Sequence, residues 1–247
     1  MTDPTAKTSP RIEPIGLDGV IVRFAEALSE PANRAALAFC AAVKADLPEG
    51  VEEMSTSLVS TYLRFDPLHV SLESLTTILT ERLAAEDWYA APLPEGRRLL
   101  HIPTVYGTDL APQLEEAAQA AGLSVEEAVK SLSEARVRVK AIGFAPGQPY
   151  LGTLPAAWDI PRQTGLTPRV PVGALVVAIR QFVLFAVSAP TGWRHVGQTA
   201  APLYQPESDD PFLLRPGDEV IFEAVDREAW DRLRADPAGG IRKDALP

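Results

Sequence analysis

Residues 143–152 read GFAPGQPYLG, and this stretch organises the interpretation of the whole chain. Three glycines and two prolines lie within these ten residues. Glycine permits unusual backbone angles and proline fixes them, so the composition predicts a rigid loop rather than a strand or helix. Such a loop can bring backbone amides close to a ligand, with Phe144 and Tyr150 as its walls. A structural crossover between two strands is the other interpretation of the same composition.

Several polar side chains follow in loops of the same half of the chain. Arg162 and Arg169 each lie beside proline, where a guanidinium group can hold a carboxylate or phosphate through two hydrogen bonds. A solvated surface charge is the alternative for each arginine. His195 is expected on a barrel surface unless it faces a cleft. The residues expected to bind a ligand are Phe144, Pro146, Gly147, Gln148, Tyr150, Arg162, Arg169 and His195.

Catalytic residues cannot be named from a pattern, because the sequence shows no Ser-His-Asp order, no Walker glycine loop and no carboxylate pair. His69, His101 and His195 show no metal-ligand spacing with one another or with Cys40, so no metal site is expected. Cys40 lies on an apolar helix face, and a buried structural thiol is expected there.

Five motifs in the second half follow one another in a distinctive order: GFAPGQPYL at 143–151, PR at 161–162, PRVPVG at 168–173, PTGW at 190–193 and VGQT at 196–199. They resemble the series GFxPGFxYL, PR, PRxxVPxGS and PGGWxxIGRT of the allophanate hydrolase subunit 1 family. That family includes the B subunit of the prokaryotic 5-oxoprolinase and an inhibitor of the sporulation kinase. The resemblance extends over nearly the whole chain.

The chain departs from the family pattern at a few positions. Leu132 and Val137 stand where the family usually has histidine and tyrosine, and the remaining departures are Gln148 for Phe, Thr191 for Gly and Gln198 for Arg. Loss of the histidine removes the group best able to move a proton near neutral pH. Either the chemistry lies elsewhere or this copy is specialised.

The first half of the chain predicts an α+β domain over residues 11–91, after a flexible tail at 1–10. Strands are expected at 20–24, 51–54 and 58–65, the last two around a Ser-Thr-Ser turn, and helices at 30–44 and 72–83. The order strand, helix, strand, strand, helix is that of a ferredoxin-like sandwich, with a final strand still to come near 87–91 or 98–105. The Pro- and Gly-rich stretch 92–96 is the expected linker.

The second half, residues 97–247, predicts a β-barrel domain with a C-terminal helix. Two helices, at 110–121 and from Ser124, follow a strand at 98–105. Short apolar runs then alternate with turns, which favours a closed or nearly closed barrel; they lie at 137–142, 174–179, 182–187, 203–204 and 219–225. The resemblance implies that this barrel is cyclophilin-like. Asp226 is expected to cap the last helix, with a loose end from Asp236.

Composition argues against some classes of partner. A formal charge of −10 and a pI near 4.9 do not favour binding to nucleic acid or to anionic lipid. No apolar run approaches the roughly 20 residues needed to cross a bilayer, and residues 1–10 lack the apolar middle of a signal peptide. A cytoplasmic location is therefore expected.

The resemblance implies a subunit of an ATP-dependent enzyme that opens 5-oxoproline, a lactam, and acts with a subunit-2 type partner. ATP is then the implied cofactor of the complex. The alternatives are a regulator that inhibits a histidine kinase and one half of a biotin-dependent carboxyltransferase like that of urea carboxylase. A prolyl isomerase is disfavoured, because a fold does not determine function. Convergent polar groups in a cleft favour an enzyme subunit, whereas an exposed apolar patch favours an inhibitor.

Overall fold

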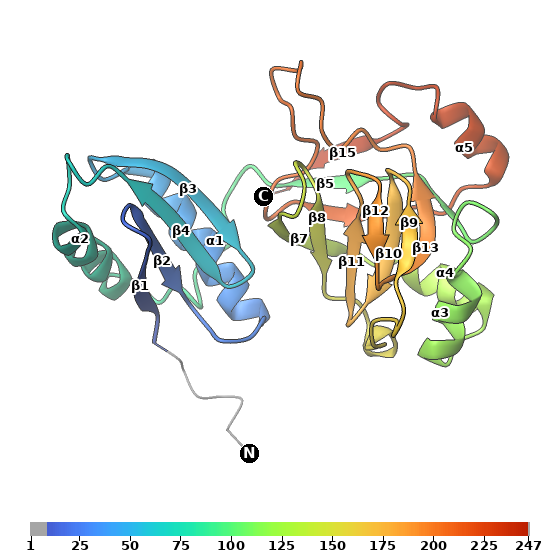
Figure 1. Ribbon diagram of the computed structural model, residues 1–247, viewed down its shortest axis with the longest axis horizontal. Coiled ribbons are helices and arrows are strands. Elements are labelled where there is room, and N and C mark those ends of the chain that lie inside the picture. Colours follow the sequence, from blue (N-terminus) through green and yellow to red (C-terminus); the bar gives the residue numbers. More distant parts are fainter. Residues whose placement is uncertain (1–8, 247) are drawn as a thin grey trace. The chain divides into compact units, whose positions relative to one another are not determined.

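The computed structural model describes residues 9–246, and the chain forms two compact units, one ending at Glu95 and one starting at Gly96 (Figure 1). Each unit has its own hydrophobic core. Residues 1–8 of the expected tail lie outside the described residues. The mixed α/β class is confirmed, and the names ferredoxin-like and cyclophilin-like stay predictions.

The first unit is an antiparallel sheet with the strand order β1-β2-β4-β3 and two helices packed on it. Alternation explains which face is covered, because Thr61, Leu63 and Phe65 of β4 are buried while their neighbours are half-exposed. Ser29 and Ser71 start the helices by accepting backbone N–H groups. The elements are β1 (Arg11–Ile15), β2 (Gly19–Arg23), α1 (Glu30–Ala45), β3 (Val51–Ser57), β4 (Ser60–Phe65) and α2 (Leu72–Ala84).

Two expectations for this unit were wrong. The Ser-Thr-Ser segment belongs to β3, and the chain turns at Leu58 instead, where φ is 52°. The expected last strand is also absent from this sheet among the described residues, and β1 takes the edge position beside β2. Pro14 and the exposed side chains of β1 explain why its pattern is weak, since proline is tolerated on edge strands.

The second unit is built from strands that form a nearly closed ring. Six of them follow the order β7-β8-β11-β10-β13-β6, and β14 pairs with both β7 and β5. An isolated β-bridge joins Thr104 of β6 to Ala224, which follows β14. Because β14 pairs with β7, this bridge connects the β6 end of the series to its β7 end. The strands are β5 (Arg98–His101), β6 (Thr104–Tyr106), β7 (Val137–Ile142), β8 (Pro149–Gly152), β10 (Ala174–Ala178), β11 (Gln181–Leu184), β13 (Arg194–Thr199), β14 (Glu219–Ile221) and β15 (Arg242–Ala245).

Helices cover this ring and extend its core. The apolar cluster inside the ring also includes Ala117 of α3 and Ala128 and Leu132 of α4. The Ser124–Glu127 capping box at the start of α4 is formed as expected. The helices are α3 (Leu114–Ala121), α4 (Val125–Ser133), the 3-10 turn η1 (Ala156–Trp158) and α5 (Arg227–Leu233).

The 143–152 stretch and the C-terminus differ from expectation. The rigid loop ends at Gln148, because Pro149–Gly152 forms strand β8 between β7 and β11. The segment Arg242–Ala245 is not loose but pairs with β5 as strand β15. Strand β8 forms a hairpin with β7 across the 143–148 loop, whereas its second partner β11 and the partner β5 of β15 come from distant sequence, so local composition does not reveal those pairings.

A small outer layer lies on one face of the β10–β13 region (Figure 1). It consists of β9 (Thr167–Val170) and β12 (Ala189–Thr191), which pair with each other. Val170 and Trp193 pack there against Val176 of β10 in a separate apolar cluster. This layer forms one side of the cleft described next.

Candidate functional site

A cleft of about 560 Å³ lies in the second unit, beside the end of β9. Ligand pockets typically measure about 300–1,000 Å³, so this volume suits a small molecule. Three loops, strand β13 and helix α5 form the walls. The lining residues are Asp109, Leu110, Pro112, Arg169, Pro171, Val172, Gly173, His195, Gln198, Thr199, Ala200, Ala201, Trp230 and Arg234.

An irregularity in the sheet places His195 and Gln198 on the same face. Residues three apart in a regular strand point to opposite faces. Here the register between β10 and β13 shifts between Leu175 and Val176, so that Val176 pairs with His195 and Ala174 pairs with Gln198. Because Ala174 and Val176 are two residues apart and share a face, their partners share it as well.

Gln198 is held in one orientation. Its Nε2 donates to Val172 O at 2.8 Å and to Thr199 O at 3.1 Å. Both neighbours are carbonyl acceptors, so the nitrogen must face them and the Oε1 atom must face away. The side chain is 5% exposed, and Oε1 has no partner at normal hydrogen-bond geometry among residues 9–246, although the Gln198 side chain lies close enough to the His195 ring to favour its protonated form.

His195 is anchored through its backbone and leaves a ring nitrogen unused. Its N–H donates to Gln113 Oε1 at 2.9 Å, and its carbonyl accepts from Gln113 N at 3.0 Å. Burial lowers the pKa of His195 below its ordinary value, although contacts with the Gly197 backbone and the Gln198 side chain oppose this by favouring the protonated ring. A neutral imidazole can accept or donate at Nε2, which has no partner within the described chain.

The rim of the cleft carries guanidinium groups. Arg169 donates from Nε to Ser188 Oγ at 2.7 Å, and no carboxylate in residues 9–246 lies within ion-pair distance of it. Arg234 stacks on the Trp230 ring, with 5.6 Å between its Cζ and the ring centroid. The carboxylate of Asp109 is engaged by Arg227 at 2.6 Å. The cleft therefore offers an uncharged polar floor and a cationic rim.

The structure brings together only some of the expected ligand-binding residues. Arg169 and His195 line the cleft, whereas Arg162 lies in another groove with its Cζ 5.3 Å from the Trp193 ring centroid. Gln148 is buried and accepts a hydrogen bond from Ala186 N, a structural role. Tyr150 packs half-buried against the outer apolar cluster.

The tip of the 143–148 loop also lies away from the lining of the cleft. Phe144 is 70% exposed, and Pro146 is exposed beside it. Gly147 has φ of 74°, and an added Cβ would come within 2.7 Å of Leu203 O. Glycine is needed there because two loops pack closely together. Gly147 therefore fits the interpretation of this stretch as a structural connection between two strands.

Sequence reasoning named only Arg169 and His195 among the fourteen lining residues of the cleft, and it missed the other twelve, including Asp109, Trp230 and Arg234. Trp230 and Arg234 come from the C-terminal helix and its cap, far along the chain from the glycine- and proline-rich motifs. Gln198 stands out in the sequence only as a departure from a family motif. No local pattern marks these residues, because the tertiary fold brings them to the cleft.

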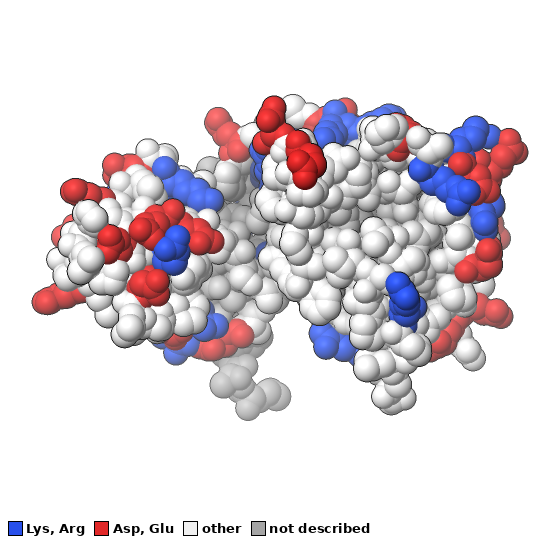
Figure 2. Space-filling view, turned by 45° about the horizontal axis from the view of Figure 1, so that its top comes forward, with Lys and Arg blue, Asp and Glu red and all other residues white. Residues whose placement is uncertain are grey.

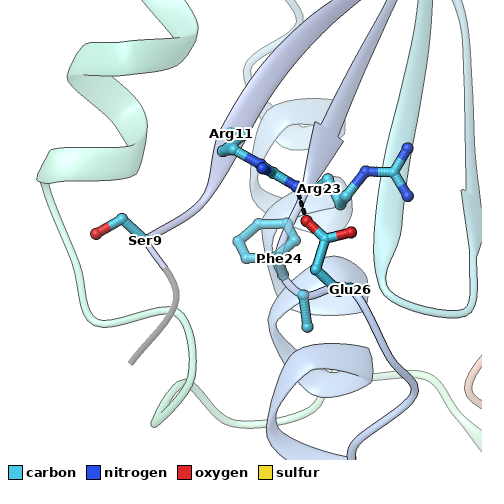
Figure 3. A pocket seen from close by; sticks show the side chains of 6 residues that line it. Ser9, Arg11, Arg23, Phe24 and Glu26 are labelled. Atoms are coloured by element: carbon cyan, nitrogen blue, oxygen red, sulfur yellow. Dashed lines mark ion pairs between the residues drawn. The ribbon is translucent and has the colours of Figure 1, made fainter. Parts of the chain in front are cut away.

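Other hollows offer less. A pocket of about 110 Å³ in the first unit contains Arg11, whose charge is paired with Glu26 (Figure 3). The groove at Arg162 has a volume of about 530 Å³, and Arg194 there is engaged by Glu116 at 2.9 Å. Residues 9–246 contain no cluster of three or more metal-ligating side chains, and none of their helices has the length and apolar character needed to span a bilayer.

Charge is mixed over the visible surface of both units. Figure 2 shows acidic and basic side chains interspersed, with a wide uncharged area on the larger unit. This face displays no continuous basic surface of the kind that grips a phosphate backbone.

Comparisons with known proteins place the chain in a family. A model of the carboxyltransferase domain, subdomain C and D, matches residues 10–214. The B subunit of the 5-oxoprolinase of Bacillus subtilis (strain 168) is 31% identical over 232 residues, which are 89% of this chain and 95% of that protein. The chain belongs to the family of 5-oxoprolinase B subunits. The corresponding protein of Escherichia coli O157:H7 is 34% identical over 179 residues, covering 72% of this chain and 79% of that protein.

Solved structures agree with this membership. The protein TTHA0988 matches with a TM-score of 0.70 and 36% identity over 84% of this chain. This chain matches only 40% of the longer TTHA0988 chain. The urea amidolyase of K. lactis matches 98% of this chain with a TM-score of 0.72 but 16% identity, which indicates a shared fold alone.

Proposed function

We propose that this chain is one subunit of an ATP-dependent 5-oxoprolinase that opens the lactam ring of 5-oxoproline to give glutamate. The observation that carries the proposal is the match over 95% of the B. subtilis protein, which is named as the B subunit of 5-oxoprolinase, at 31% identity. As a B subunit, that protein acts together with other subunits. The polar cleft in the second unit supports the proposal, because it suits a small polar substrate.

We further propose that the chain works with a subunit-2 type partner. TTHA0988 supports this, because the matched region makes up 40% of a single longer chain and the rest of that chain can supply what this one lacks. The cleft supports it too, because His195 is the only group on its floor that can exchange a proton near neutral pH among the described lining residues. Further catalytic groups are then expected from the partner.

ATP is a requirement of the proposed reaction, but apart from its cationic rim the cleft lacks the features of a typical triphosphate site. No lysine is present among its described lining residues, and the Asp226 carboxylate occupies the N-terminus of α5 by accepting from Ala229 N. We therefore assign no residue of this chain to ATP. The lactam and its carboxylate are the parts of the reaction for which the cleft offers groups.

A regulatory role is the second candidate. Phe144 is 70% exposed, and Tyr204 and Phe212 stack on the surface with 5.2 Å between ring centroids. Exposed aromatic surface favours docking onto another protein, which an inhibitor of a histidine kinase would need. An enzyme subunit needs such a surface as well. The polar cleft favours the enzyme subunit. A carboxyltransferase half is supported by the carboxyltransferase-domain model that matches residues 10–214 and by the fold shared with the urea amidolyase.

Complex formation tests the proposal. The chain and a subunit-2 type protein of the same family system are co-expressed, and the mixture is analysed by size-exclusion chromatography at micromolar concentration. One joint peak containing both proteins is expected. Independent elution of the two proteins would refute the partnership.

A further inference from the structure

The segment 203–214 forms an arm that leaves the strand ring between β13 and β14 (Figure 1). Both of its ends are held in the core, since Leu203 and Leu214 are 2% and 1% exposed. The arm closes on itself at its base, where Leu213 N donates to Leu203 O at 3.1 Å. Residues 204–210, by contrast, are all exposed. The core therefore uses the ends of the arm but not its outer part.

Two aromatic rings stand near the base of the arm. Tyr204 and Phe212 stack with 5.2 Å between their ring centroids and an interplanar angle of 25°. The two residues are 42% and 40% exposed. A groove of about 410 Å³ lies beside the arm, and Phe212, Leu213 and Ile241 form part of its apolar lining. Exposed aromatic rings beside a pocket are typical of the residues that dominate binding between proteins.

The 143–148 loop adds a third aromatic residue next to the arm. The loop and the arm are in contact, because a Cβ added at Gly147 would lie 2.7 Å from Leu203 O and 3.4 Å from Tyr204 Cβ. Phe144 in this loop is 70% exposed, and its φ is 72°. A bulky side chain is disfavoured in this left-handed region, and burial of the ring does not offset the strain. A strained, exposed aromatic residue indicates a role in function rather than in stability.

Charge on the arm selects the kind of partner. The outer part reads PESDDP at 206–211 and carries three carboxylates. Asp210 is paired with Arg215 at 2.8 Å, whereas Glu207 and Asp209 have no ion pair among residues 9–246. A symmetric dimer through this surface would bring like charges together, and anionic lipid or nucleic acid would be repelled. A protein surface with an apolar slot and a basic rim is complementary to the arm.

We propose that the arm and Phe144 form the docking surface for the subunit-2 type partner. The partner presents an apolar slot to the aromatic rings and Lys or Arg side chains to Glu207 and Asp209. The inference rests on the proposed function, which supplies the partner, and it adds the surface that binds that partner. It also assigns a role to the 143–148 loop, which presents Phe144 beside the arm.

Binding of the purified full-length chain to the purified subunit-2 type protein tests the surface, with biolayer interferometry as the measurement. Phe144→Gly and Phe212→Ala should each raise Kd about tenfold or more, because aromatic anchors supply much of the affinity of an interface. Leu166→Ala is the matched control, since Leu166 is also 70% exposed in the second unit but lines the groove at Arg162. Phe144→Gly has a second readout. Glycine relieves the left-handed strain, so this variant should melt at or above the wild-type temperature.

A charge reversal tests the basic rim of the partner. Glu207→Lys combined with Asp209→Lys should slow association about tenfold or more at low salt, because charges at the edge of an interface act mainly on the association rate. The matched control combines Glu49→Lys with Glu86→Lys, which changes the net charge equally from exposed positions in the first unit. Equal slowing by the control, or no slowing by the arm variant, would overturn the basic rim.

Failure of this inference can be told apart from failure of the proposed function. If folded Phe144→Gly and Phe212→Ala proteins bind with wild-type affinity, or Leu166→Ala weakens binding equally, the surface is wrong and the partnership stands. If the wild-type chain does not bind the subunit-2 type protein at micromolar concentration, the partnership is wrong and the docking surface falls with it. Thermal melting verifies folding, and Phe144→Gly alone decides the outcome if Phe212→Ala does not fold.

Discussion

Replacing Leu132 with histidine should destabilise the second unit rather than restore a proton-transfer group. The resemblance implies that the family usually has histidine at this position. Leu132, however, is 0% exposed and belongs to the apolar cluster inside the strand ring, with Ala128 and Trp158. Burying a leucine contributes about 1.5–3 kcal/mol. A buried ring nitrogen without a partner costs about 1–3 kcal/mol more. The expected loss is therefore roughly 3–5 kcal/mol, a large part of the total of about 5–15 kcal/mol.

Urea unfolding of the wild type, Leu132→His and Leu132→Met measures this loss. Methionine keeps the volume and the apolar character, so the control should lose less than about 1.5 kcal/mol. Restored turnover is not expected from Leu132→His in the reconstituted pair. A histidine variant within about 0.5 kcal/mol of the wild type, with a higher rate, would refute the placement of this residue in the core.

Further predictions concern the cleft and its supports. Burial lowers the pKa of His195, so below about pH 6.5 the unfolded chain binds a proton that the folded chain does not. The free energy of unfolding should therefore fall as the pH drops below about 6.5. Thermal melts over a pH series should show a smaller decline for His195→Asn. Gly173→Ala should cost well over about 1 kcal/mol, since its added Cβ would lie 2.3 Å from a carbonyl oxygen, whereas Gly122→Ala, with φ of 69° and nothing within 4 Å, should cost about 1–2 kcal/mol. Arg169→Gln and Arg162→Gln should each change the free energy of unfolding by no more than about 0.5 kcal/mol, because both side chains are exposed. Thermal melting of both variants beside the wild type checks this.

The sequence predicts elements well where local rules control them. The Ser124 capping box, the Asp226 cap and the strand Val137–Ile142 all follow from short-range patterns, and the structure contains each. Strand β1 escapes prediction because Pro14 and its exposed residues give an edge strand little apolar alternation.

The cleft is predicted only in part, for a physical reason. Arg169 stands out because prolines flank it, and His195 stands out as a residue whose role depends on where it faces. The placement of His195 and Gln198 on one face depends on a register shift between β10 and β13, which no alternation rule contains. Trp230 reaches the same cleft from α5, a contact that depends on the tertiary fold.

The central claim is that this chain acts as one subunit of an ATP-dependent 5-oxoprolinase. The most direct measurement is formation of glutamate from 5-oxoproline and ATP by the purified chain, by the purified partner and by the two combined. The account predicts turnover by the combination and none by this chain alone, because the sequence has no Walker glycine loop and the cleft has no lysine among its described lining residues. Turnover by the isolated chain, or a stable complex that forms no glutamate from 5-oxoproline, would contradict it.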